Sequence, residues 1–145
     1  TKKGDTGMDQ SISWQIDLGD KVVRYREQSF SATTGMLTLD EHWNPYKLHI
    51  DDSAAHLVLN ATWLESYEET KLATGVQAVT TQERDRWSVI ALAEKVTVPA
   101  GTFYAVVFQK IGGTSSKMYW YVPGLGKVKE SGGQLEELVS SEVTP

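Results

Sequence analysis

The side chains grouped so that they could move protons in a hydrolytic reaction form two sets: the run Asp40, Glu41 and His42, and the acids Glu65, Glu68 and Glu69. Paired acids cleave glycosidic bonds when they lie about 5 to 10 Å apart around a substrate. Acidic clusters are also common on solvated strand faces, and the chain contains neither a G-x-S-x-G motif nor a cysteine nucleophile. We therefore predict no catalytic residue and no enzyme. A hydrolase using Asp40, Glu41 or His42 is the least favoured alternative.

The pattern H-x-D-D-x3-H brings together the candidate metal ligands His49, Asp51, Asp52 and His56. A zinc or iron site needs three or four ligands that converge on one point. Aspartates in a turn also hydrogen-bond backbone amides, which explains the same residues without a metal. We predict no metal and no cofactor.

Composition excludes several classes of protein. The 145 residues suit one domain, residues 1–145, with a polar, disordered terminus at 1–7. A net charge of −5 without a basic stripe argues against a nucleic-acid partner. The absence of cysteine excludes a disulfide scaffold, and no apolar run is long enough for a membrane-spanning helix. Charged residues on the exposed strand faces argue against a membrane-spanning barrel.

Residues 94–130 carry the strongest β-strand pattern. Val96 and Val98 open a strand, and Pro99-Ala100-Gly101 forms a tight turn, because proline presets φ and glycine supplies a positive φ. The returning run 102–111 has apolar residues on both faces, which predicts a strand covered on both sides.

Short alternating segments fill the rest of the chain. We expect strands at 11–18 and 21–31, with an irregularity near 27–29, and a third strand that ends at Asn44-Pro45. Beyond that break, apolar and polar residues alternate again at 46–50. A strand from Leu57 to about Tyr67 follows, although SYEETKLA also has helical propensity. The pattern further predicts a strand at 76–81, a charged loop at 82–86, a strand at 87–93, and a last strand at 135–143 that could instead contain a helical turn.

These segments add up to nine or ten short strands without a crossover helix. The predicted fold is therefore all-β, an antiparallel meander that forms a closed barrel or a curved half-barrel, with short helical turns allowed.

The run VTVPAGTF, followed by YWYVPGLGKVKE, resembles a signature of bacterial envelope and lipoprotein β-domains over residues 96–130. Such domains are similar to the half-barrel sheets of periplasmic lipoprotein carriers. The resemblance implies an extracytoplasmic location, in the periplasm or outer envelope, and a concave apolar face. It implies no enzyme, since the shared residues form turns. A lipid anchor, which needs an acylated cysteine, would lie upstream of Thr1.

Aromatic residues are the remaining candidates for a binding site. The chain has five tryptophans and six tyrosines, which could fill the core or line a ligand cavity. Alternation sends Trp120 to the face opposite Tyr119 and Tyr121, so one face should be core and the tyrosine face accessible. We predict a ligand site formed by Trp63, Tyr119, Trp120 and Tyr121.

The leading hypothesis is a non-enzymatic envelope domain that binds a hydrophobic small molecule, a lipid or an envelope protein on its curved sheet. An alternative is a structural or assembly module with a filled core, which would form oligomers or pair through an edge strand.

Overall fold

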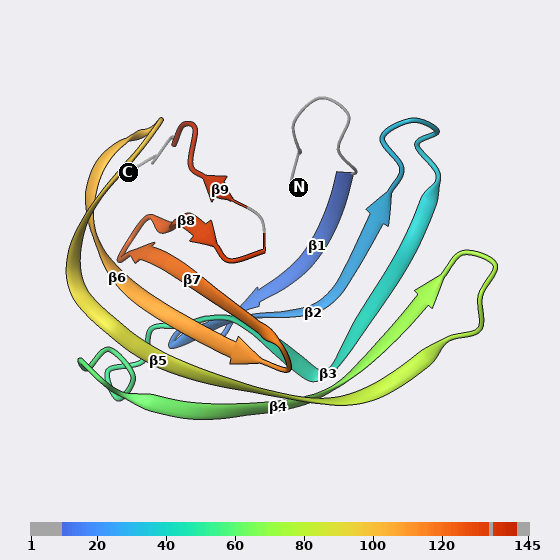
Figure 1. Ribbon diagram of the computed structural model, residues 1–145, viewed down its shortest axis with the longest axis horizontal. Helices are drawn as coiled ribbons and strands as arrows, with labels where there is room; N and C mark the ends of the chain where they lie inside the picture. The colour runs from blue at the N-terminus through green and yellow to red at the C-terminus, as the bar shows by residue number, and fades with distance from the viewer. Residues whose placement is uncertain (1–9, 134, 142–145) are drawn as a thin grey trace. The chain divides into compact units, whose positions relative to one another are not determined.

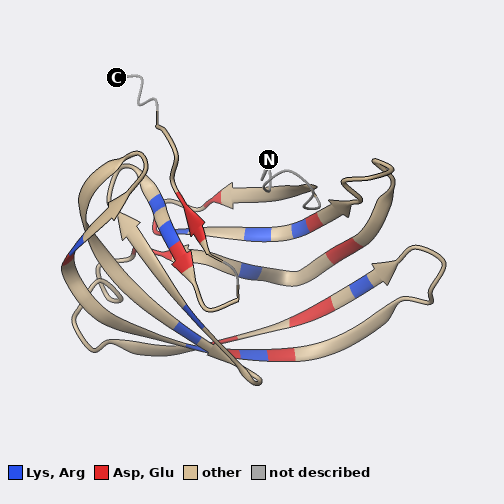
Figure 2. Cartoon of the chain, turned by 45° about the horizontal axis from the view of Figure 1, so that its top comes forward, with Lys and Arg blue, Asp and Glu red and all other residues tan. Residues whose placement is uncertain are grey.

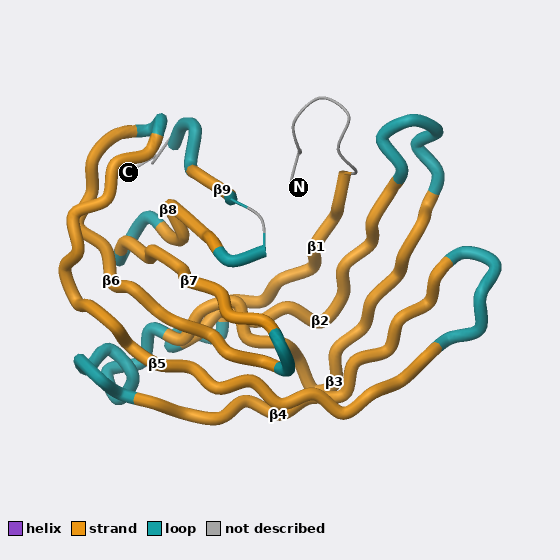
Figure 3. Tube along the Cα trace, viewed as in Figure 1, coloured by secondary structure: helices purple, strands orange, loops and turns teal. Residues whose placement is uncertain are grey.

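The computed structural model describes residues 10–133 and 135–141, and the described residues form strands and turns without a helix (Figures 1 and 3). Neighbouring strands run antiparallel in the order of the chain. Within the described residues the strands are β1 (Gln10–Asp17), β2 (Lys21–Phe30), β3 (Leu37–Asp51), β4 (Thr62–Ala73), β5 (Val79–Val98), β6 (Gly101–Gly112), β7 (Ser115–Val122), β8 (Gly126–Ser131) and β9 (Glu136–Glu137). The predicted all-β antiparallel meander is confirmed.

The chain divides into two compact units. The described part of the first unit is 10–52 and 66–83, and that of the second is 53–65, 84–133 and 135–141. Strands β4 and β5 contribute residues to both units. A single domain over 1–145 stays a prediction, and the disordered terminus predicted at 1–7 lies outside the described residues.

In the first unit, β1 and β2 form the predicted hairpin. The amide of Gly19 donates to Oδ1 of Asp17 at 2.8 Å, and Gly19 has a φ of 93°, which glycine adopts without strain. The main irregularity of β2 lies at Tyr25, an extra residue between the positions that pair with Trp14 and Gln15. The sequence predicts this irregularity near 27–29 instead. A smaller register shift does lie at the end of that range, between Ser29 and Phe30.

The prediction that the third strand ends at Asn44-Pro45 is wrong, because β3 runs on to Asp51. His42 pairs with Arg26 and Lys47 pairs with Arg24, so four residues of β3 bulge opposite Tyr25 alone. A bulge tolerates proline because its residues need not all donate an N–H to the neighbouring strand.

Two further boundaries differ from the expectation. Residues 53–61 form turns, and β4 begins at Thr62 and continues as a strand to Ala73, through the stretch with helical propensity. The predicted charged loop at 82–86 is part of β5. Asp85 in this run is 5% exposed, and its carboxylate lies 3.0 Å from Nζ of Lys110. A charged residue occupies the covered face of a strand here because it has a partner there.

The sheet of the second unit is curled. The amide of Ala100, in the turn between β5 and β6, donates to the carbonyl of Leu138 at 3.0 Å, and the amide of Leu138 donates to the carbonyl of Val128 at 2.8 Å. The segment after β9 therefore meets the β5–β6 turn (Figure 1). Of the predicted last strand at 135–143, the described residues form only β9.

The core of this curl consists of buried Val96, Val98, Ala105 and Val128, packed against Phe103, Trp120 and neighbouring apolar residues. Residues 105–108 of β6 are all buried, which confirms that this strand is covered on both faces.

Candidate functional site

Three of the four predicted binding residues, Trp63, Tyr119 and Tyr121, belong to one cluster of aromatic rings in the second unit. Trp120 lies on the opposite face, as alternation predicted, since Trp120 pairs with Val107 and Tyr119 pairs with Phe108. The expectation that the tyrosine face is accessible is wrong. Tyr119 is 6% exposed and Tyr121 is 9% exposed. Their face is covered because both rings lie in this packed cluster.

Four rings of this cluster stack in sequence, and we call them the aromatic row: His56, Trp63, Trp87 and Tyr119. The centroids of His56 and Trp63 lie 3.9 Å apart with planes 8° from parallel. Trp63 and Trp87 are separated by 6.1 Å, and Trp87 and Tyr119 by 5.4 Å. Both tryptophan rings meet the ring of Phe108 edge-on, at 6.3 and 6.4 Å.

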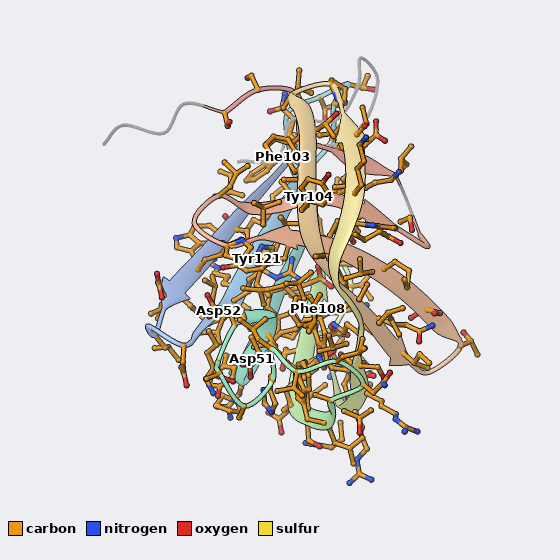
Figure 4. All side chains as sticks on the ribbon, turned by 90° about the vertical axis from the view of Figure 1, so that its left-hand side faces the viewer. Asp51, Asp52, Phe103, Tyr104, Phe108 and Tyr121 are labelled. Carbon is orange, nitrogen blue, oxygen red and sulfur yellow. The ribbon has the colours of Figure 1, made fainter. Side chains whose placement is uncertain are left out.

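The rings of Phe108 and Tyr121 meet with centroids 6.4 Å apart and are buried, whereas Tyr104, on the same strand as Phe108, is 67% exposed (all three are labelled in Figure 4). Sequence reasoning missed His56, Trp87 and Phe108 as members of the site. The available signal was the pairing of β5 with β6, which places Val89 opposite Phe108 and Trp87 two residues away on the same face.

Charged groups flank the buried end of the row. Nζ of Lys110 lies 5.3 Å from the centroid of Trp87, and this ammonium forms a salt bridge with Asp85. Nζ of Lys127 lies 5.7 Å from the centroid of Tyr119 and bonds to Glu130 and Glu136. The lysines of β8 lie beside the glutamates of β9, Lys127 with Glu136 and Lys129 with Glu137, and Figure 2 shows the basic and acidic positions in colour. Each ammonium is both neutralised and placed over a ring, which fixes this end of the row.

The other end of the row, at Trp63, is less enclosed by the protein. The side chain of Trp63 is only half-buried, and its indole N–H is buried without a hydrogen-bond partner among the described residues. Trp87, in contrast, donates its indole N–H to Oε2 of Glu65 at 2.9 Å. The ring that covers Trp63, His56, comes from the 53–61 turns, in which several side chains are exposed. An unpaired buried donor beside a turn segment is the feature of this unit best suited to receive a ligand.

Trp120 contributes to a different surface. Its indole N–H bonds to Glu94, and Nζ of Lys129 lies 5.2 Å from its ring centroid and 3.6 Å from the carboxylate of Glu137. Trp120 is therefore not a member of the row: its ring packs against the core of the curl, and its N–H bonds to Glu94.

The hydrolase candidates Asp40, Glu41 and His42 lie in the first unit, where Asp40 and His42 lie together and Glu41 lies apart from them. Asp40 accepts two hydrogen bonds from Arg26, at 3.0 and 2.7 Å, and the guanidinium lowers the pKa of this carboxyl. Nε2 of His42 lies 3.1 Å from the same carboxylate. Glu41 points to the other face, 3.7 Å from Lys71, and burial raises its pKa. Asp40 is thus a clamped structural carboxylate.

The remaining acids also have structural partners. Oε2 of Glu65 accepts the indole N–H of Trp87, and Oε2 of Glu69 accepts that of Trp43. Across residues 10–133 and 135–141, no three His, Cys, Asp or Glu side chains are grouped so as to hold a metal ion, and His49, Asp51, Asp52 and His56 form no such group. The same residues contain no helix with the length and apolar character needed to cross a membrane.

The chain matches no family model, and comparisons with curated proteins and with solved structures find no similar protein.

Proposed function

We propose that this protein is a non-enzymatic domain of the bacterial envelope that binds an apolar ligand through the Trp63 end of the aromatic row. One observation carries the proposal: the half-buried Trp63 ring holds a stacked partner on its face, while its buried indole N–H has no acceptor in the part of the chain that the structure describes. A ligand with a flat apolar group and a hydrogen-bond acceptor would satisfy both.

Binding would proceed by displacement of His56. The imidazole leaves the Trp63 ring, the ligand stacks in its place, and an acceptor on the ligand takes the indole N–H. Covering about 200 Å² of apolar ligand surface supplies about 5 kcal/mol before ordering costs. Aromatic stacking adds about 1 kcal/mol, but much of this only replaces the lost His56 contact.

The extracytoplasmic location rests on the motif at 96–130. Its turn residues behave as turn-formers in the structure: Gly101, Gly124 and Gly126 have φ values of 143°, 82° and 109°. A hydrophobic small molecule, a lipid or an apolar segment of an envelope protein would each offer the required group. Fractionation of cells that produce the natural protein tests the location, and recovery in the cytoplasm would contradict it.

A hydrophobic fluorophore such as N-phenyl-1-naphthylamine tests the site. We expect saturable binding by the folded protein and a loss of at least about tenfold in affinity for Trp63→Ala, equivalent to about 1.4 kcal/mol. Trp63→Phe keeps a ring but removes the N–H, so it separates stacking from hydrogen bonding. Trp120→Ala, on the opposite face, is the matched control and should bind as the wild type does. Absence of saturable binding, or equal losses in both alanine variants, would contradict the proposal.

The assembly module stays the second candidate because most of the row is filled core. Trp87 and Phe108 are both 0% exposed, and Tyr119 is nearly so. This candidate predicts oligomers without uptake of a small molecule, which light scattering combined with the fluorophore titration distinguishes.

A further inference from the structure

The sheet has two terminal strands, β1 and β9, and they differ in how their outer edges are protected from pairing with another strand. Strand β9 has two residues, both glutamate, which form salt bridges with Lys127 and Lys129 of β8. The following residue, Leu138, is tied by its amide and its carbonyl to Val128 and Ala100. Short length and charge are common ways of protecting an edge from pairing.

Strand β1 has none of these protections. It is eight residues long, it carries no charge from Gln10 to Ile16, and it contains neither proline nor glycine. Among the described residues it pairs on one side only, with β2. The bulge at Tyr25 lies in β2, so the alternation of β1 itself is regular. A regular strand of this kind presents outward-facing N–H and C=O groups at alternate residues.

Apolar side chains accompany this open edge. Ile12 and Ile16 share one face of β1 and are 41% and 47% exposed. Trp14 lies between them, with the guanidinium of Arg26 4.9 Å from its ring centroid. On the other face, Oγ of Ser13 is buried without a hydrogen-bond partner among the described residues. The edge therefore offers backbone groups, an apolar row and an unpaired hydroxyl together.

We propose that β1 pairs antiparallel with β1 of a second copy of this chain, around a two-fold axis at Trp14. In this register Ile12 lies opposite Ile16 of the second copy, so the two exposed apolar rows cover each other. Ser13 lies opposite Gln15 of the second copy, whose amide reaches a hydroxyl directly across a strand pair. Asp17 lies opposite Ser11, so no like charges face each other.

A second copy fits this edge better than a continuing fibre. The pairing is isologous and uses the open edge of both copies, and β9 has no comparable edge for a further copy. The proposal is independent of the ligand site, because β1 belongs to the first unit and the aromatic row to the second.

The absence of cysteine makes the register directly testable by single-cysteine cross-linking. Directly opposite residues have Cα atoms about 4.5 to 5.5 Å apart, which suits a disulfide. A mixture of Ile12→Cys and Ile16→Cys chains should therefore form disulfide-linked dimers under mild oxidation. Each variant alone should not, because equivalent positions would lie about 13 Å apart. Leu72→Cys, equally exposed at 47% but on β4, replaces one member of the mixture as the control and should remain unlinked.

Light scattering of the unmodified full chain should show a concentration-dependent dimer. The double variant Ile12→Lys, Ile16→Lys should raise the dissociation constant of this dimer at least tenfold. Leu72→Lys makes the same change away from the edge and should leave the dimer unchanged. A monomer at every concentration, cross-linking of either variant with itself, or loss of the dimer in Leu72→Lys would overturn the proposal.

Discussion

The indole N–H of Trp43 donates to Oε2 of Glu69 at 2.8 Å, and both residues are buried in the first unit. The same carboxylate lies 3.4 Å from Nζ of Lys71 and 4.0 Å from Nζ of Lys47. The ammonium of Lys47 also lies 5.3 Å from the centroid of Trp43. A carboxylate on the covered face of a strand is thus held by one neutral donor and two cations.

Removing the neutral donor, the indole N–H of Trp43, should destabilise the folded protein. We expect Trp43→Phe to lower the free energy of unfolding by about 2 kcal/mol, because hydrogen bonds to charged groups contribute about 1.5 to 3 kcal/mol. Trp120→Phe is the matched control, since its N–H also bonds to a glutamate but at an exposed site. Trp120→Phe should lower the free energy of unfolding by less than about 1 kcal/mol. Urea unfolding measures both, and equal costs would contradict the structural role of the Trp43–Glu69 contact.

Ionisation of Asp40 should make the stability of the folded protein depend on pH. Arg26 lowers the pKa of Asp40 in the folded state, so its contribution is complete above the unfolded pKa, near 4, and is lost as pH falls through the lower folded pKa. Asp40→Asn should therefore lower the urea midpoint at pH 7. Its difference from the wild type should shrink as pH falls below about 4. A difference that does not change with pH would contradict the role of the ionised carboxylate.

Glu41 should behave in the opposite way. Burial raises its pKa, so folding favours the protonated form, and the wild type loses stability as pH rises between the unfolded and the raised folded pKa. We expect Glu41→Gln to match or exceed the wild type in stability at pH 7, and to lack the gain that the wild type shows on mild acidification. Urea midpoints across this pH range measure it. A clear destabilisation at pH 7 would show that the 3.7 Å contact with Lys71 outweighs burial.

Phe108 and Tyr104, two of the three aromatic residues of β6 labelled in Figure 4, should differ sharply in their effect on stability. Phe108 is 0% exposed and contacts three other rings, so Phe108→Ala should cost about 3 to 5 kcal/mol. Tyr104 is 67% exposed, and Tyr104→Ala should stay within about 0.5 kcal/mol of the wild type. Thermal and urea unfolding measure both, and similar costs would contradict the burial pattern of this strand.

Local pattern was sufficient for most of the strands and turns. The Pro99-Ala100-Gly101 turn, the coverage of β6 on both faces and the position of Trp120 opposite the tyrosines all follow from alternation and turn chemistry, and the structure confirms them. The errors at Pro45 and at 82–86 have a different origin. In both cases a residue that usually ends a strand is tolerated because of a neighbour on another strand: the β2–β3 bulge for Pro45, and Lys110 for Asp85.

The sequence by itself therefore determined an all-β meander and the relative faces of adjacent residues, because a strand has a fixed two-residue period. Only the tertiary structure decided which face is covered. The burial of Tyr119 and Tyr121 depends on rings that other strands bring against them. The stacking of His56 on Trp63 depends on how the 53–61 turns lie against β4, and the indole N–H of Trp63 has no hydrogen-bond partner among the described residues. Alternation relates a side chain to its neighbours along one strand, whereas burial and hydrogen bonding depend on what other strands and turns bring against it.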